Sequence, residues 1–159
     1  MTWVETTDVE SRYIKTIFAE HSSFYGMVVH QESIKVSTGK RIGMIDVTQQ
    51  VKEAVARSRV KRGLASVWVC HTSASITVNE NNRVLLEDII ENLTRLVPVD
   101  GEYGHRDNAH AHILSALIKP NVEIPVSEGK PGLGTFQSIL LVEFDGPRER
   151  TMTVTVLGE

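Results

Sequence analysis

A continuous apolar run at residues 65–70 most constrains the fold of this 159-residue chain. It contains Val67, Trp68 and Val69 and is typical of a β-strand that is covered on both faces. Such a strand needs structure packed on each side of its sheet, so we expect a layered domain. The segment that follows, His71-Thr-Ser-Ala-Ser-Ile-Thr-Val-Asn79-Glu80, keeps the strand pattern but is much more polar. It is therefore the first candidate for a functional site.

Helix signals occur at three places along the chain. Thr48 offers an N-cap hydroxyl for a helix of about 14 residues. Asn81 or Asn82 can cap a second amphipathic helix, which Pro98 terminates. Apolar residues at helical spacing predict a short third helix over residues 108–117. The first two helices are expected to pack against a sheet.

Strand signals are more numerous than helix signals. Residues 24–36 predict a β-hairpin, and residues 138–144 and 151–157 predict two strands joined as a hairpin. Strands and helices in mixed order indicate an α+β domain, which we place at residues 24–159. Residues 1–23 are interpreted as an N-terminal extension whose spacing suggests one short amphipathic helix.

Composition excludes several classes of function. A net charge of −3 provides no basic field for nucleic acid. The single cysteine, Cys70, rules out an internal disulfide and fits a reducing compartment. No apolar run approaches the roughly 20 residues that span a bilayer, and no basic segment leads into an apolar one at the N-terminus. We therefore expect a soluble cytoplasmic protein without nucleic-acid or membrane partners.

A second polar cluster, Tyr103-Gly-His105-Arg-Asp107-Asn108-Ala-His110-Ala-His112, adds three imidazoles to that of His71. Three histidines with an open position are typical of a catalytic zinc site. On a helix that begins near residue 107, His110 points away from His112. We therefore predict that His112 pairs with His105 and keep His110 in reserve. The alternative is that these histidines are surface or helix-capping residues.

The first cluster leaves its own alternatives open. His71 ends a buried strand, where a histidine can be a hydrogen-bonded core residue or a ligand. Its hydroxyl neighbours, Ser73 among them, favour the ligand interpretation, because buried hydroxyls need partners. Glu80 precedes a helix, so its carboxylate either stabilises the helix dipole or acts as a general base or acid beside a metal-bound water.

Two later segments are weaker candidates for anion binding. Gly132-Leu-Gly134-Thr135-Phe-Gln137 can present backbone amides and a hydroxyl, but it is not a P-loop, and a tight turn explains it equally well. Arg148 follows Gly-Pro in a turn and is either a solvated charge or a clamp for phosphate or carboxylate. Arg150 is interpreted as a solvated charge.

Taken in order, these segments together with Ile124-Pro-Val126 and Glu143-Phe-Asp-Gly-Pro-Arg148 resemble the YjbQ family, also called UPF0047. The resemblance covers the chain from about residue 27 to its C-terminus. It implies an α+β domain with a mixed sheet, assembled as a homotrimer, and a secondary thiamine-phosphate synthase activity. One departure is Phe136, which stands where many members have tryptophan. The site residues that the resemblance implies are His71, Asn79, Glu80, His105, Asn108, His112, Gly134, Thr135 and Gln137.

Together these observations predict a metal-dependent enzyme for a small phosphorylated or heterocyclic substrate. A divalent metal, zinc or magnesium, would be held by His71, His105 and His112, and Glu80 and His71 would act in catalysis. The alternatives are a non-catalytic trimeric protein that binds a metal or small anion, and a metal-dependent hydrolase. The residues expected to bind substrate are Ser73, Asn79, Asn108, Gly134, Thr135, Gln137 and Arg148.

Overall fold

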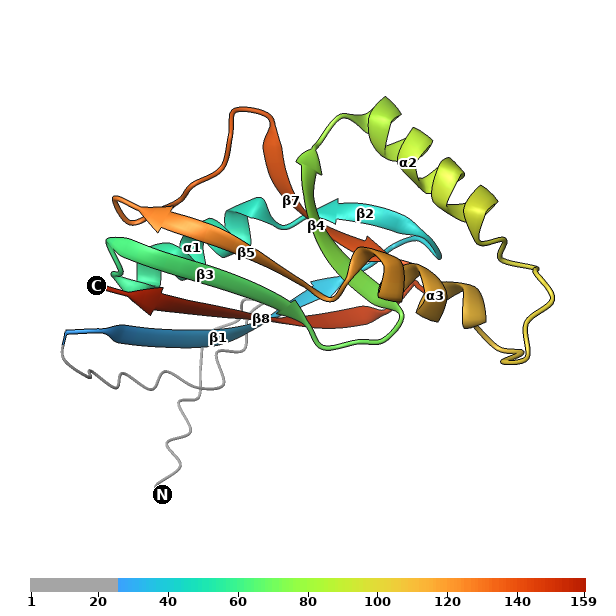
Figure 1. Ribbon diagram of the computed structural model, residues 1–159, viewed down its shortest axis with the longest axis horizontal. Coiled ribbons are helices and arrows are strands. Elements are labelled where there is room, and N and C mark those ends of the chain that lie inside the picture. Colours follow the sequence, from blue (N-terminus) through green and yellow to red (C-terminus); the bar gives the residue numbers. More distant parts are fainter. Residues whose placement is uncertain (1–25) are drawn as a thin grey trace, which may run out of the picture.

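A computed structural model describes residues 26–159, which form eight strands and three helices (Figure 1). Five strands make one sheet in the order β1-β8-β3-β5-β6, and three make a second in the order β2-β7-β4. The strands are β1 (Val28–Ser37), β2 (Gly43–Asp46), β3 (Arg62–Val69), β4 (Ala74–Glu80), β5 (Asn121–Ser127), β6 (Lys130–Pro131), β7 (Gln137–Glu143) and β8 (Glu149–Gly158). The helices are α1 (Thr48–Ser58), α2 (Arg83–Leu96) and α3 (Ala109–Ile118).

The α+β class is confirmed, but the sheets differ from the expected mixed sheet. Each strand pair within the described residues is antiparallel. The apolar run at residues 65–70 predicted a strand covered on both faces. Strand β3 is central in its sheet, because it pairs with both β8 and β5, but the described residues cover only one of its faces and leave Trp68 50% exposed on the other. Its inward side chains Val67 and Val69 are buried.

The main core lies between α1 and the two sheets. Helix α1 buries Val51, Ala54 and Val55 on one face against the strands. Thr48 does not cap this helix as predicted. Instead the Asp46 carboxylate accepts from the Thr48 amide at 2.8 Å, and the Thr48 hydroxyl accepts from the Ile139 amide at 2.8 Å. The threonine thus joins α1 to β7.

Both predicted hairpins are wrong, although strands do form in both segments. Residues 28–37 form the single strand β1, which pairs along its length with β8. Strands β7 and β8 belong to different sheets, so the segment between them crosses from one sheet to the other. Both errors concern which strands pair with each other. Strand β8 pairs with β1 and β3, whereas β7 pairs with β2 and β4.

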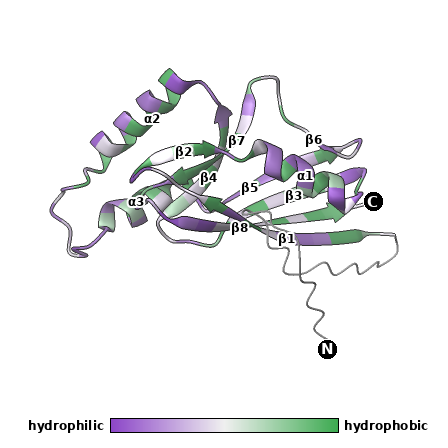
Figure 2. Ribbon diagram, turned by 180° about the vertical axis from the view of Figure 1, so that it is seen from behind, coloured by the Kyte–Doolittle hydropathy of each residue, from purple (hydrophilic) through white to green (hydrophobic). Residues whose placement is uncertain are grey.

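Helices α2 and α3 lie at the end of the molecule remote from the C-terminus (Figure 1). Asn82 caps α2, because its side-chain oxygen accepts from the amides of Val84 and Leu85. No residue of α2 is fully buried. Figure 2 shows hydrophilic and hydrophobic residues alternating along this helix. The apolar stripe predicted for α2 is therefore real but only partly covered by this chain.

The expected N-terminal extension, residues 1–23, and its amphipathic helix lie outside the described residues. Among residues 26–159 no helix combines the length and the apolar character needed to cross a membrane.

Candidate functional site

The predicted site residues gather where the turn from β3 to β4 meets the start of α3. His112 lies in the first turn of α3, and its Nδ1 is 3.0 Å from the backbone oxygen of Thr72. A carbonyl oxygen only accepts, so Nδ1 donates this hydrogen bond. A neutral His112 then has its lone pair on Nε2. This is the arrangement of a histidine prepared to bind a metal or accept a proton.

A chain of hydrogen bonds sets the orientation of His105 in a similar way. The side-chain nitrogen of Asn108 donates to the carboxylate of Asp145 at 2.9 Å, so the amide oxygen of Asn108 faces His105 Nε2 at 3.2 Å. Nε2 must therefore donate, which leaves the lone pair of a neutral His105 on Nδ1. Arg148 completes the chain, because its guanidinium donates to the same carboxylate at 2.7 Å.

His105 and His112 are neighbours, with ring centroids 5.4 Å apart and rings inclined at 66°. His112 borders two pockets. It shares one of about 460 Å³ with His105, Tyr103 and Ile113, and another of about 510 Å³ with His71. His105 and His112, which were predicted to act together, are thus adjacent, and His71 borders the second pocket together with His112.

His71 has a different hydrogen-bonding state from the other two histidines. The backbone amide of Thr151 donates to His71 Nε2 at 2.8 Å. A neutral His71 therefore carries its proton on Nδ1, and that N–H has no partner among residues 26–159. Burial, followed by the positive charge of Arg150, lowers the pKa of His71 below its ordinary value. His71 is neutral at pH 7 and presents a donor.

These protonation states decide which residues suit a divalent metal. Metal ligation needs a nitrogen lone pair, which His105 and His112 both have available. His71 would have to give up its hydrogen bond to Thr151, so it fits a metal poorly. Residues 26–159 contain no group of three His, Cys, Asp or Glu side chains placed to hold a metal ion. Two imidazoles of this chain fit such an ion, and its remaining ligands would have to come from elsewhere.

His110 and Ser73 are both buried, and His110 also borders a pocket of about 460 Å³ together with His105. His110 is 1% exposed, and its Nε2 donates to the backbone oxygen of Phe144 at 3.2 Å. The Ser73 hydroxyl accepts from the buried Arg150 guanidinium at 3.1 Å. In this chain Ser73 therefore supports a buried ion pair.

That ion pair joins Arg150 to Glu143, with Arg150 3% exposed and Glu143 1% exposed. Arg150 Nε donates to Glu143 at 2.7 Å, and the Thr38 hydroxyl donates to the same carboxylate at 2.9 Å. These hydrogen bonds outweigh burial and lower the pKa of Glu143. The solvated role predicted for Arg150 is wrong. The alternation of Arg150 with Met152, Val154 and Val156 along β8 was the signal that it points inward.

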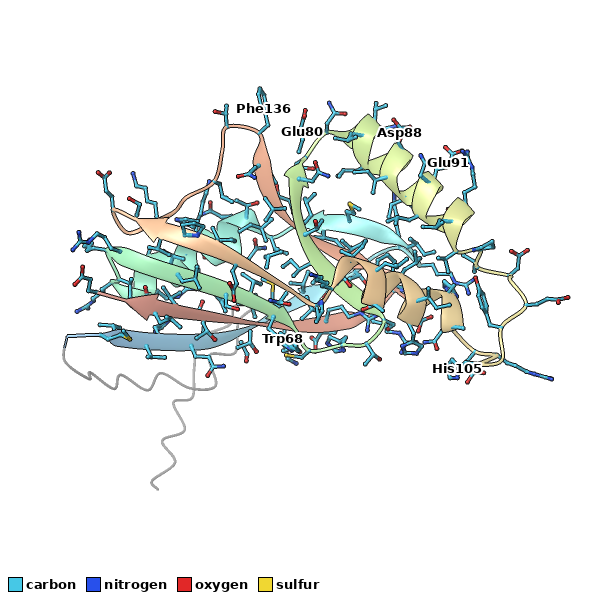
Figure 3. All side chains as sticks on the ribbon, in the orientation of Figure 1. Trp68, Glu80, Asp88, Glu91, His105 and Phe136 are labelled. Atoms are coloured by element: carbon cyan, nitrogen blue, oxygen red, sulfur yellow. The ribbon has the colours of Figure 1, made fainter. Side chains whose placement is uncertain are left out.

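The other predicted site residues lie at the far end of β4. This strand starts beside the histidines and has seven residues, so Glu80 is roughly 20 Å away along it. Glu80 pairs with Gln137 in the register of β4 and β7, and Gly134 and Gln137 close a turn on each other. Glu80 and Phe136 are adjacent in Figure 3, far from His105. Within one chain the structure does not bring Asn79, Glu80, Gly134, Thr135 and Gln137 to the histidines.

Comparison with known proteins places this arrangement in a family. The family model described as UPF0047 protein YjbQ-like matches residues 32–159. The chain belongs to the YjbQ family. Its YjbQ relatives include a UPF0047 protein of Methanocaldococcus jannaschii, 40% identical over 79% of this chain and 92% of the relative. YugU of Bacillus subtilis is 32% identical over 80% of this chain and 98% of its own.

Solved structures of YjbQ proteins share the fold. A YbjQ-like protein of unknown function from Sulfolobus solfataricus superposes with a TM-score of 0.82 at 40% identity, over 84% of this chain and 99% of that one. An uncharacterised YjbQ family protein from Clostridium acetobutylicum gives 0.76 at 40% identity, over 78% and 98% of the two chains. The α+β fold described above is therefore the YjbQ fold.

Proposed function

We propose that this YjbQ protein is a metal-dependent enzyme acting on a small phosphorylated or heterocyclic substrate. The observation that carries the proposal is the adjacent pair His105 and His112, whose outward nitrogens are set by Asn108 and by the Thr72 carbonyl. Histidines held by such hydrogen bonds are typical of metal sites. Zinc or magnesium bound there would supply positive charge to neutralise a phosphate or diphosphate group.

The site is completed by a second subunit in this proposal. One chain separates the histidines from Asn79, Glu80 and Gln137 by the length of β4. A homotrimer places the Glu80 end of one subunit against the histidine end of the next, so that each trimer has three such sites. The half-covered apolar face of α2 supports an oligomer, because an apolar stripe is normally buried against a partner.

The best named candidate for the reaction is thiamine-phosphate formation. In that reaction the nitrogen of a thiazole phosphate forms a bond to the methylene carbon of a pyrimidine diphosphate, while the bond from that carbon to oxygen breaks and pyrophosphate leaves. His71 Nδ1–H would donate to the substrate. Arg148 and Asn108 both donate to the Asp145 carboxylate, so the Arg148 guanidinium would be available to an anionic group bound near Asn108. Glu80 from the neighbouring subunit would orient the reacting groups or accept a proton.

Metal content and turnover test the proposal together. The full-length protein is dialysed, its metal is measured by mass spectrometry, and turnover is assayed with pyrimidine diphosphate plus thiazole phosphate. We expect retained zinc or magnesium, and loss of both metal and turnover in His112→Ala. Asn92→Ala, on the exposed face of α2, is the control and should behave like wild type.

The possible failures are distinguishable. A protein that retains metal without this turnover is either a hydrolase for another phosphorylated substrate or a non-catalytic binding protein, and release of phosphate from simple phosphate esters separates the two. A protein that retains no metal and shows no turnover contradicts the proposal.

A further inference from the structure

A pocket between the loop that joins α2 to α3 and the first turn of α3 has no role in the function proposed above (Figure 1). It has a volume of about 460 Å³ and is bordered by residues 99–103, residues 105–107, Ala109 and His110. Figure 3 labels His105 in this loop. The volume lies within the range of roughly 300–1,000 Å³ that is usual for small-molecule sites.

One nitrogen of His110 is available to a ligand in this pocket. The His110 side chain is 1% exposed, and its Nε2 donates to the backbone oxygen of Phe144 at 3.2 Å. A neutral His110 therefore has its lone pair on Nδ1. This Nδ1 has no hydrogen-bond partner among residues 26–159, yet protein atoms do not enclose it completely. It therefore opens onto the pocket that His110 borders.

The other polar side chains of the pocket are mostly acceptors as well. The Tyr103 hydroxyl donates to the Pro98 carbonyl at 2.8 Å, so its oxygen is left to accept. The carboxylates of Asp100, Glu102 and Asp107 border the pocket, and none of them has a hydrogen-bond or ion-pair partner within residues 26–159. A ligand that satisfies these atoms has to bring hydrogen-bond donors.

The charge of the pocket specifies the ligand further. Arg106 is the one lysine or arginine among the described residues that border it. The N-terminus of α3 adds a partial positive charge, equivalent to roughly half an elementary charge. Three carboxylates outweigh both, so the pocket favours a cation. No three His, Cys, Asp or Glu side chains of residues 26–159 are placed to hold a metal ion, and the favoured cation is therefore organic.

We propose that this pocket binds a small organic cation with a primary ammonium group. The ammonium donates to His110 Nδ1, and the carboxylates of Asp100, Glu102 and Asp107 neutralise its charge. His110 and His112 lie about 200° apart around α3, so the site differs from the pocket that His112 shares with His105. It needs neither a metal nor turnover.

Four ligands of similar size test the site by ligand-observed NMR titration of the full-length protein in EDTA. The titration is done at pH 8, where a histidine with the ordinary pKa of about 6.5 is neutral. Butylammonium has a positive charge and N–H donors, whereas tetramethylammonium has the charge without the donors. The compound 1-pentanol is neutral, and pentanoate is an anion. We expect affinity to fall in that order.

Replacing the three carboxylates by amides of the same shape tests the charge. We expect butylammonium to bind about tenfold more weakly, because three weak charge interactions are lost together. The variant combines Asp100→Asn, Glu102→Gln and Asp107→Asn.

A matched control removes the same charge from the exposed face of α2. It should bind butylammonium like wild type, since its substitutions lie outside the pocket. The control combines Glu87→Gln, Asp88→Asn and Glu91→Gln.

A substitution of His110 tests the hydrogen bond separately. In His110→Gln the side-chain amide can still donate to the Phe144 carbonyl, but the acceptor at the position of Nδ1 is lost. We expect this variant to bind butylammonium and tetramethylammonium with similar affinity, while still preferring both to 1-pentanol. Urea denaturation verifies that it is folded, and the carboxylate variant tests the site without any change to a buried residue.

Four outcomes overturn the inference. The first is that 1-pentanol or pentanoate binds wild type as tightly as butylammonium does. The second is wild-type affinity in the carboxylate variant, or an equal loss in the α2 control. The third is a preference for butylammonium over tetramethylammonium that His110→Gln leaves unchanged. The fourth is a fall in oligomer mass in the carboxylate variant, measured by light scattering, because the pocket would then be a contact between subunits.

Discussion

Hydrogen bonds to single atoms assign distinct roles to histidines that look alike in the sequence. His71 accepts a backbone N–H, His112 donates to a backbone carbonyl, and His110 is buried against Phe144. His71 and His112 border one pocket, and His110 borders another together with His105. The chemistry available to each imidazole therefore depends on which of its ring nitrogens is hydrogen-bonded to the backbone and which remains available.

The buried ion pair predicts that two neighbouring arginines, Arg150 and Arg148, contribute unequally to the free energy of unfolding. Arg150→Met leaves the Glu143 carboxylate buried without its partner, which should lower the free energy of unfolding by about 3–5 kcal/mol. Arg148→Met removes a more exposed contact to Asp145 and should cost at most about 1 kcal/mol. Urea denaturation of both variants measures the difference. Equal losses would contradict the structural role assigned to Arg150.

The environment of His71 predicts a loss of stability in mild acid. Its pKa is lowered in the folded protein, so the unfolded chain binds the proton more readily. Stability is therefore lost as the pH falls below the ordinary value of 6.5. Glu143 and Asp145 also have lowered pKa values, but their contributions to stability are lost only from about pH 5 downward.

His71→Gln isolates this contribution, because glutamine keeps an acceptor for Thr151 and does not titrate. Between pH 7 and pH 5, wild type should lose more unfolding free energy than His71→Gln. The measurement is a series of urea denaturations across that range. Parallel losses in the two proteins would show that His71 is not responsible.

At the level of elements, junctions between sheets and helices were harder to predict than the elements themselves. The three helices and the strands β3, β4, β7 and β8 occur close to their predicted positions. Strand pairing was not predictable, because a short strand can pair with any edge that covers its apolar face. The contact between α1 and β7 was not predictable either. The Thr48 hydroxyl accepts a hydrogen bond from the Ile139 amide of β7 instead of capping its own helix.

This junction can be tested by removing one hydroxyl. Thr48→Val leaves the buried Ile139 amide without its acceptor and should cost about 1–3 kcal/mol. Thr94→Val is the matched control, because the Thr94 hydroxyl donates only to carbonyls of its own helix, those of Ile90 and Glu91. Thermal and urea unfolding measure both changes. A control loss as large as that of Thr48→Val would argue against the junction.

At the level of the whole molecule, the two groups of predicted site residues lie at opposite ends of β4. If neighbouring subunits of a homotrimer complete each site, the two ends can be supplied by different chains. Light scattering should then give a mass of three times 17.7 kDa. A monomeric mass would contradict the composite site.

Mixing inactive variants provides the stronger test. His112→Ala and Glu80→Gln should each be inactive alone, since each damages one end of the site. Unfolding and refolding them together gives mixed trimers in which some interfaces combine an intact His112 with an intact Glu80. Random mixing at equal amounts restores roughly a quarter of the wild-type sites. Recovery of no activity, with mixed trimers verified by mass, would place the whole site within one chain.

The sequence by itself determined the α+β class, the strand at β3 and the three helices, and it indicated that His105 and His112 lie near each other. These depend on periodicity, capping residues and helical geometry, which are local properties of the chain. Only the tertiary structure decided which sheet each strand joined, that Arg150 is buried, and that Glu80 lies far from the histidines of its own chain. Those outcomes depend on contacts between residues distant in sequence, where burial and hydrogen-bond partners are set by the packed molecule. The polar segment after β3 is thus a short turn followed by one strand, β4, which begins beside the histidines and ends at Glu80, far from His105.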